Sequence, residues 1–356
     1  MTNEWHELLS ASSAVQQSTT ESISALAGYV ANDTPQLTDL SGYRVFEISG
    51  GDATAFLQGQ FCNDIAGVSS SQAQITGYCT PKGRLLALPT IVGANNNYRM
   101  LVPDNVAEAF IKRLSMFVMR SDVTITPLID WVVVGVTADA SGSVGALSEH
   151  LPELPTEVLS ATGEQSTDDP GQTIRWHDDV TRVSRQRYLR LAPLASQKAL
   201  WNAIDNDEHK HAQASWRLAD ISAGIPSITE GIVEAFVPQM LNLQLINALS
   251  FTKGCYPGQE IVARMQYLGK LKRHMRVFTL ALDGIDVDAL LKPGVTLSLD
   301  ADENAGIVID AMPYSSDKAL VLAVTKVTPA HSEFALSGAS LEPRNMPYEL
   351  PSLEVA

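Results

Sequence analysis

The sequence predicts an α+β protein with more than one domain. Its 356 residues, 45% of them hydrophobic, are too many for the usual single core. Up to about residue 245, strand-like segments with alternating apolar and polar residues lie beside a few helical patterns. Beyond that point, closely spaced short strands are separated by Gly, Pro and Asp turns, which is typical of a small β-barrel or sandwich.

The first predicted domain covers residues 36–125 and follows an N-terminal extension, residues 1–35. The extension is rich in Ser, Thr and Gln and has weak helical periodicity, so we expect it to be loosely attached. Asp52 is expected to cap a short helix, and Asp104 a longer one. The inward face of the longer helix would carry Val106, Ala109, Phe110, Leu114 and Phe117. Strands are expected over 43–50, 73–80, 84–92, 98–102 and 123–127.

The second predicted domain covers residues 126–245, and the third covers 246–348. In the second, we expect strands over 131–137 and 181–193, a polar surface loop over 162–172, and helices over 196–204 and 215–222 that end before Gly224 and Pro226. The third holds a glycine-rich segment and then the short strands, expected over 274–282, 294–299, 305–312 and 318–327.

Charge and composition narrow the classes of function. With 25 basic and 40 acidic residues, the chain has a net charge of −15, which disfavours non-specific binding to nucleic acid. It has no long apolar run, and its first residues lack the pattern of a secretory or transit peptide, so we expect a cytoplasmic protein with no membrane association. Three cysteines without a CxxC pair fit a reducing compartment. No P-loop, GxGxxG or GxSxG motif is present.

The segment Lys253 to Glu260, KGCYPGQE, is the candidate functional site. Two glycines and a proline shape the backbone around Cys255, so we predict a tight loop that presents the thiol. A thiol reacts as the thiolate, which nearby cations favour, and Lys253 is two residues away. We therefore predict an exposed functional thiol that is tuned by Lys253. The other motif positions are Gly254, Tyr256, Gly258 and Gln259.

A basic stretch extends from this motif. Residues 253–276 hold six basic residues against one acid, Glu260, and so offer the best candidate anion site in an acidic chain. A structural alternative remains open for each feature. Cys255 could be a buried core residue, the basic run could be a solvated face, and Gly258 to Glu260 could simply begin a helix. The basic residues are Lys253, Arg264, Lys270, Lys272, Arg273 and Arg276.

At these residues the sequence resembles the YgfZ family, folate-binding proteins related to the glycine cleavage T-protein. The hallmark KGCYxGQE is complete in Lys253 to Glu260 and is followed by the family-like IVAR. Other segments match in the same order along the chain. They are FLQGQFCNDI (56–65), YCTPKGRL (78–85), ADISAGIP (219–226) and PQMLNLQ (238–244).

The resemblance implies a fold and a role. The expected fold is α+β, with three domains around a central channel for folate and a C-terminal small β-barrel. The implied function is that of a folate-binding accessory protein, and we expect a monomer. It would support iron-sulfur enzymes, including a methylthiotransferase that modifies tRNA, through Cys255. Direct tRNA binding is the less favoured alternative, because the chain is acidic.

The resemblance also assigns residues to folate. Trp216 and Tyr43 match two aromatic positions that report on folate, with ordinary core packing as the alternative for both. Asp64, in the family-like NDI, is assigned to the channel, with a turn aspartate as the alternative. Arg264 supplies a cation for the glutamate tail of folate.

A folate-dependent aminomethyl transferase is the alternative function. The catalytic aspartate of the T-protein sits several residues into a helix that follows a strand, and Phe110 stands near that position here. The sequence therefore gives no clear general base, and we leave the assignment as an enzyme undecided, leaning against it.

Two other groups of polar residues have mainly structural interpretations. His209 and His211 lack the third and fourth ligands of a zinc site, so we predict no metal site. A second basic strip is interpreted as a solvated strand edge, with contact to a folate tail or RNA as the alternative. It consists of Arg182, Arg185, Arg187 and Arg190.

Overall fold

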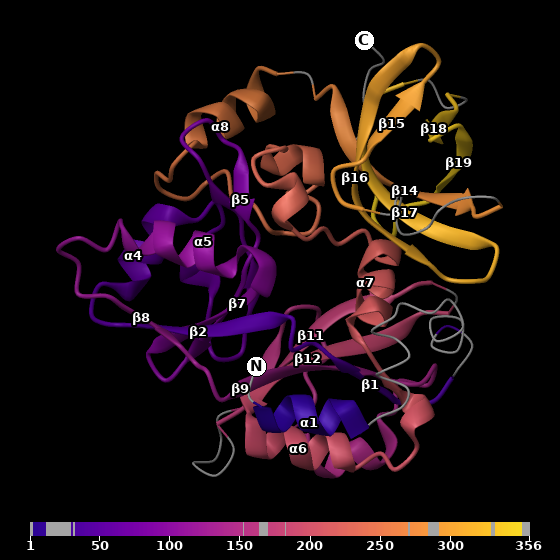
Figure 1. Ribbon diagram of the computed structural model, residues 1–356. Helices are drawn as coiled ribbons and strands as arrows, with labels where there is room; N and C mark the ends of the chain where they lie inside the picture. The colour runs from indigo at the N-terminus through magenta and orange to yellow at the C-terminus, as the bar shows by residue number, and fades with distance from the viewer. Residues whose placement is uncertain are drawn as a thin grey trace.

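The structure is a computed structural model that describes residues 3–11, 30, 33–151, 153–163, 170–181, 183–269, 271–283, 292–328 and 332–350 (Figure 1). Its strands form a five-stranded sheet, a six-stranded sheet, a two-stranded sheet and a closed six-stranded barrel. Helices lie beside the two larger sheets and between them and the barrel. The predicted α+β class and the C-terminal barrel are therefore confirmed. Within the described residues, no helix is long and apolar enough to cross a membrane.

The five-stranded sheet has the order β3-β6-β7-β2-β8, and all its pairs are antiparallel. The strands are β2 (Tyr43–Ser49), β3 (Gln74–Ile75), β6 (Thr90–Ala94), β7 (Asn97–Pro103) and β8 (Thr124–Pro127). β4 (Tyr78–Cys79) and β5 (Leu85–Ala87) form the two-stranded sheet. β2, β7 and β8 agree with predicted strands. The strands predicted over 73–80 and 84–92 are each divided, the first into β3 and β4 and the second into β5 and β6, and the two parts of each belong to different sheets.

Two helices accompany this sheet, α4 (Ala53–Gln60) and α5 (Asp104–Ser115). α5 buries Val106, Ala107, Phe110 and Leu114, so the predicted inward positions of Ala109 and Phe117 are wrong. Asp52 occupies the N-cap position of α4, as predicted, but its carboxylate makes no capping hydrogen bond and instead accepts one from the Asp122 backbone N–H. The predicted cap of α5 is wrong, because Pro103 is its N-cap and Asp104 is its first residue, paired with Arg44.

The six-stranded sheet has the order β10-β11-β12-β9-β1-β13. Although β1 lies in the first predicted unit, it pairs with β9 and β13 of this sheet. The strands are β1 (Gln36–Asp39), β9 (Trp131–Thr137), β10 (Ala161–Gly163), β11 (Gln172–Asp179), β12 (Arg185–Pro193) and β13 (Lys210–His211), accompanied by α6 (Leu194–Asn202).

The N-terminal helix α1 (Asn3–Ala11) is packed on this part of the molecule. The Trp5 ring is fully buried, meets Trp201 edge to face at 5.4 Å, and donates a hydrogen bond of 3.0 Å to Asp39. The loose attachment expected for the extension is therefore wrong for α1. Residues 12–29 of the predicted extension lie outside the described residues.

The basic strip on β12 is buried, so its interpretation as a solvated edge is wrong. β12 pairs with β11 on one side and β9 on the other, so it is an inner strand of the sheet and not an edge. Arg185, Arg187 and Arg190 are each at most 3% exposed. The charge of Arg185 is balanced by Asp179 at 2.6 Å, as a buried charge requires. Arg182 lies outside the described residues.

The C-terminal strands close into a barrel of order β14-β17-β16-β15-β18-β19. Of the two architectures left open by the sequence, the barrel is thus the observed one. Its strands are β14 (Arg273–Ala281), β15 (Thr296–Leu299), β16 (Asp302–Pro313), β17 (Lys318–Lys326), β18 (Phe334–Leu336) and β19 (Ala339–Arg344). The helices α7 (Gln213–Ser222) and α8 (Gln259–Tyr267) lie between β13 and β14 in the sequence.

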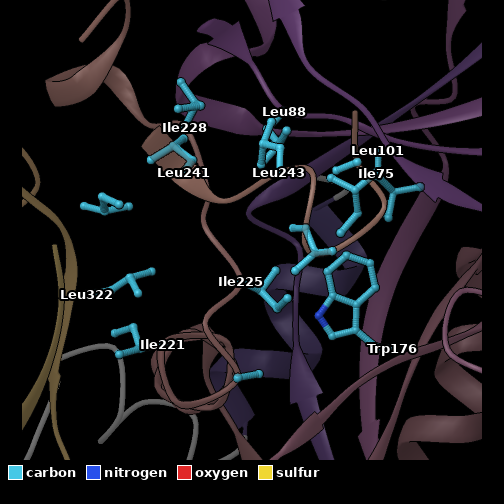
Figure 2. Close-up of a cluster of buried hydrophobic side chains, with 14 of the residues drawn as sticks. Ile75, Leu88, Leu101, Trp176, Ile221, Ile225, Ile228, Leu241, Leu243 and Leu322 are labelled. Carbon is cyan, nitrogen blue, oxygen red and sulfur yellow. The ribbon is translucent and has the colours of Figure 1, made fainter. Parts of the chain in front are cut away.

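One hydrophobic core joins all these parts (Figure 2). Ile75 and Leu101 come from the five-stranded sheet, Trp176 from the six-stranded sheet, Ile221 from α7 and Leu322 from the barrel. Burial of this shared apolar surface fixes the sheets and the barrel relative to one another.

Candidate functional site

The segment KGCYPGQE leads into α8 at the periphery of the molecule (Figure 1). Cys255 is exposed, whereas Cys62 and Cys79 are buried, and all three are free thiols. The predicted exposure of Cys255 is therefore confirmed, and the alternative of a buried core cysteine is excluded. Gly258 is the N-cap of α8, so the helix-start interpretation is also correct.

Lys253 points into the protein and anchors the segment. Its side chain is 7% exposed, and its ammonium donates hydrogen bonds to the carbonyl oxygens of Gln58 at 2.6 Å, Phe61 at 2.5 Å and Asn63 at 3.0 Å. An ammonium has three N–H donors, so these bonds leave none for the Cys255 sulfur. Burial lowers the pKa of Lys253 to about 8. The structure thus places Lys253 as a latch between the motif and the end of α4.

Tyr256 lies beneath the loop. Its ring centroid is 5.3 Å from the Lys253 nitrogen, a cation-π contact, and the side chain is buried. Burial, followed by the nearby Cys62 and Cys79, raises its pKa, so the phenol stays neutral. A hydrogen bond with Cys62 and burial raise the pKa of Cys79, which keeps that thiol protonated. The buried side chains of Lys253 and Tyr256 therefore hold the loop in place on either side of the exposed Cys255.

Gly258 fixes the path of the chain into α8. Its φ of +85° is left-handed, and a Cβ atom there would lie 2.4 Å from the Thr80 carbonyl oxygen. Only glycine fits this close approach to the turn of residues 80–83. Gly254 differs, because a Cβ atom there would meet nothing within 4 Å. The protein's own packing thus requires Gly258 but not Gly254.

A cavity of about 570 Å³ lies between α7, the start of β2 and the barrel, away from Cys255. Tyr43 lines it and also borders a second cavity of about 450 Å³. Burial, and then the charges of Asp220 and Asp310, raise the pKa of Tyr43, so its phenol remains a hydrogen-bond donor. The other charged residues that line the larger cavity are Asp104, Arg217, Glu230 and Lys292.

Two ion pairs shape the cavity wall. Arg217 on α7 binds Asp310 on β16 through two hydrogen bonds, of 3.0 and 2.5 Å, and so joins the helix to the barrel. Asp220 accepts hydrogen bonds from Arg187 at 2.7 Å and from Trp176 at 2.8 Å. Burial raises the pKa of Asp220, while Arg187 acts in the opposite direction. The wall therefore offers both acceptors and donors to a ligand.

Trp216 lies behind this wall, in the core. It is 1% exposed, and the Arg187 guanidinium stacks over its ring at 4.4 Å. Its ring packs so closely on Gly135 that a Cβ atom there would lie 2.5 Å from it. Arg187 also binds Asp220, so one side chain connects Trp216 to the cavity lining.

The remaining predicted folate residues lie elsewhere. Asp64 is the N-cap of the 3₁₀ helix η1 (Ile65–Gly67) and accepts hydrogen bonds from Ala66 and Gln58, which agrees with the alternative of a turn aspartate. Arg264 is exposed on α8 and does not line the cavity. Of the four residues assigned to folate from the sequence, only Tyr43 reaches this cavity.

Sequence reasoning missed several cavity residues, namely Asp220, Arg217, Asp310 and Lys292. Asp220 lies within ADISAGIP, a segment noted for its resemblance, so a signal was present there. The Arg217–Asp310 pair joins residues 93 positions apart, and no local pattern indicates such a contact. Within the described parts of the chain, no group of three or more His, Cys, Asp and Glu residues is arranged to hold a metal ion.

The fold is that of glycine cleavage aminomethyltransferases. The chain matches the crystal structure of the aminomethyltransferase T of Bartonella henselae with a TM-score of 0.68, over 91% of this chain and 89% of that one, at 13% identity. Phe110, which stands near the position expected for the catalytic aspartate, is 3% exposed and packs on Phe61 and Tyr78.

Sequence comparison then gives the family. The chain is 31% identical to the "tRNA-modifying protein YgfZ" of Colwellia psychrerythraea over 238 residues, which is 67% of this chain and 69% of the relative. It is 30% identical to the protein of that name from Edwardsiella ictaluri over 67% of this chain and 69% of the relative. For Cronobacter sakazakii the identity is 26%, over 81% and 84%. No family model matches the chain. The chain belongs to the YgfZ family, as the motif predicts.

Proposed function

We propose that this chain is a folate-binding accessory protein that supports the assembly or maintenance of iron-sulfur enzymes, including those that modify tRNA, and acts through Cys255. The observation that carries this proposal is the exposed Cys255 thiol, held on a loop that Lys253 anchors to the protein interior. Membership of a family whose relatives are named tRNA-modifying proteins supports the link to tRNA modification. We place the protein in the cytoplasm as a monomer.

The finer architecture belongs to the same proposal. The two larger sheets and the barrel represent three domains, and the 570 Å³ cavity is part of a folate channel between them. Its volume is in the usual range for small-molecule sites, about 300–1,000 Å³. Its lining includes Asp220 from α7, Tyr43 from β2 and Asp310 from the barrel, so a ligand there would contact all three parts.

The lining suits the chemistry of folate. A pterin ring has N–H groups that can donate hydrogen bonds to carboxylates such as Asp220 and Glu230. Its flat face can stack on the Tyr43 ring. The glutamate tail is an anion, and Lys292 on the rim is a cation that can bind it. Trp216 would report on folate through Arg187 and Asp220 rather than by contact.

Folate binding is tested by titrating tetrahydrofolate while following tryptophan fluorescence and calorimetric heat. We expect saturable heat and a fluorescence change that is reduced in Trp216→Phe. Absence of both signals at millimolar ligand contradicts the folate part of the proposal. It leaves the role of the thiol to be judged separately.

The role of the thiol is tested by complementation. In a strain that lacks the protein, Cys255→Ala should fail to restore tRNA methylthiolation although it folds normally, because the side chain is exposed and makes little contribution to packing. Cys255→Ser separates the loss of sulfur from the loss of size. Full restoration of methylthiolation by Cys255→Ala contradicts a functional thiol.

One observation favours the second candidate, a folate-dependent aminomethyl transferase. Although Phe110 is buried in the core, the carboxylates of Asp104 and Asp220 line the cavity and are available to a bound folate. Turnover of methylenetetrahydrofolate by the purified protein, lost in Asp104→Asn, would establish this activity. Without such turnover, the accessory function stands alone.

A further inference from the structure

The outer face of α8 is apolar and exposed. The helix buries only Val262, while Ile261 is 38%, Tyr267 68% and Leu268 85% exposed. Ile261, Arg264 and Leu268 are three and four residues apart, so they share one side of the helix. Burial of large apolar side chains is favourable, so several of them exposed together mark a surface that binds something.

This face is continuous with the functional loop. Gly258, three residues after Cys255, begins α8, and the turn of residues 80–83 packs against both Gly258 and the Ile261 side chain. The turn thereby brings the exposed Lys82 to the same region. We define the α8 face by six residues. They are Lys82, Cys255, Ile261, Arg264, Tyr267 and Leu268.

Gly254 indicates an approach to the thiol. Gly254 does not have the left-handed φ of Gly258, and a Cβ atom there would meet open space. The protein's own structure therefore does not need a glycine next to Cys255. The missing side chain instead leaves room for a partner group to reach the sulfur.

The charge of the face indicates the chemistry of its partner. Lys82 and Arg264 are two exposed cations beside one exposed acid, Glu260 in the first turn of α8, so this region has a net positive charge in a chain of net charge −15 and attracts acidic groups. Covering Ile261 and Leu268 lowers the free energy only when the covering surface is apolar. RNA offers phosphates but little aliphatic surface, and its binding needs several free cations. A protein segment with acidic side chains beside an apolar one satisfies both demands.

We propose that the α8 face is the docking surface for such an acidic, apolar segment of a client protein, which it holds over Cys255. This inference rests on the proposed function, because the client is the iron-sulfur enzyme served by the thiol. Docking orients the client, and Cys255 makes the contact that supports its cluster. The energy of docking comes from burial of Leu268, Tyr267 and Ile261, and Arg264 and Lys82 select an acidic partner.

The test uses Leu268→Ser and Arg264→Glu, with Met116→Ser as the matched control. Met116 is also the residue that follows a helix, and it is 69% exposed at the end of α5. All three positions are exposed, so the three variants should unfold at the same urea concentration as the parent. The probe is the purified tRNA methylthiotransferase, added while the rate of Cys255 alkylation by iodoacetamide is measured.

We expect the methylthiotransferase to slow Cys255 alkylation in the parent and in Met116→Ser. Leu268→Ser and Arg264→Glu should need about tenfold more of it for the same protection, and they should restore tRNA methylthiolation poorly. Protection equal to that of the parent in both variants overturns the docking surface. So does protection by tRNA alone that weakens as salt rises, because the partner would then be RNA.

Failure of the docking surface can be distinguished from failure of the proposed function. If Cys255→Ala is inactive while the two α8 variants restore methylthiolation fully, the docking surface is wrong and the proposed function stands. If Cys255→Ala restores methylthiolation, both are overturned.

Discussion

The ammonium nitrogen of Lys253 lies 2.5 Å from the carbonyl oxygen of Phe61. Two further carbonyls, those of Gln58 and Asn63, complete its set of acceptors. The motif lysine therefore binds the backbone at the end of α4 and in the loop that follows it, while the motif cysteine faces solvent. Lys253 therefore anchors the segment, and Cys255 presents its thiol to solvent.

Lys253→Met should destabilise the protein without changing the reactivity of Cys255. The variant leaves three carbonyl groups without their donor, and removal of a buried charge offsets part of that cost. We expect a net loss of about 1–3 kcal/mol in the free energy of unfolding, measured with urea. Lys318→Met, at an exposed position on β17, is the control.

The same variants separate anchoring from tuning of the thiol. The rate of Cys255 alkylation at pH 7 should be the same in Lys253→Met as in the parent, because the Lys253 N–H groups bind carbonyls. A rate that falls in Lys253→Met, but not in Lys318→Met, would show that the lysine does act on the thiol.

Lys292→Ala should weaken the binding of tetrahydrofolate but not of tetrahydropterin. Lys292 is exposed at the rim of the cavity, so the change should not disturb the fold, and only folate carries the anionic tail that this cation would bind. We expect about a threefold to tenfold rise in Kd for folate, measured by calorimetry. Lys318→Ala is the control. Equal weakening of both ligands would place the tail elsewhere.

Acid should destabilise the protein in part through His274. Burial, and then Arg276, lower the pKa of this histidine on β14 from 6.5 to about 4. Between these values the unfolded chain binds a proton that the folded chain does not, so stability is lost as pH falls through this range.

Urea unfolding at pH 7 and pH 5 measures the effect. One such histidine contributes a loss of about 1–2 kcal/mol, which His274→Gln should remove. His6, exposed on α1, is the matched control, and His6→Gln should leave the pH dependence unchanged. If His274→Gln loses as much stability between pH 7 and pH 5 as the parent does, then the His274 ring takes up its proton equally in the folded and the unfolded chain.

The sequence predicted most of the strands and the exposure of Cys255, because both depend on local pattern. Short apolar runs bounded by turn signals mark β2, β7, β9 and β14, and the glycines and proline of KGCYPGQE indicate a loop that presents its thiol. The burial of Arg187 could not be predicted in this way. A charged residue on a strand normally faces water, and the burial of Arg187 depends on partners that no local pattern reveals, among them the distant Asp220 and Trp216.

Long-range pairing also hid much of the candidate site. β1 precedes the five-stranded sheet in the chain but joins the six-stranded one, because its partner β9 lies about 95 residues later. The cavity lining likewise combines Tyr43, Asp220 and Asp310, which share no local motif. The direction of Lys253 was unpredictable for the same reason, since its acceptors precede it by more than 180 residues.

Substitution by alanine should destabilise the protein at Gly258 but not at Gly254. Gly258→Ala adds a Cβ atom at a left-handed φ and within 2.4 Å of the Thr80 carbonyl oxygen, so we expect it to destabilise the protein by at least about 1–2 kcal/mol. Gly254→Ala meets open space, so the free energy of unfolding should stay within about 0.5 kcal/mol of the parent.

Gly254 should matter for function although it does not matter for stability. Gly254→Ala should lower tRNA methylthiolation in the complemented strain despite its normal stability, because the added methyl group obstructs a partner that approaches Cys255. Gly67→Ala, which also adds its Cβ atom to open space but lies in η1, is the control and should restore methylthiolation fully. If Gly254→Ala restores it equally well, a partner does not pass over Gly254, and Cys255 must be reached from its other side.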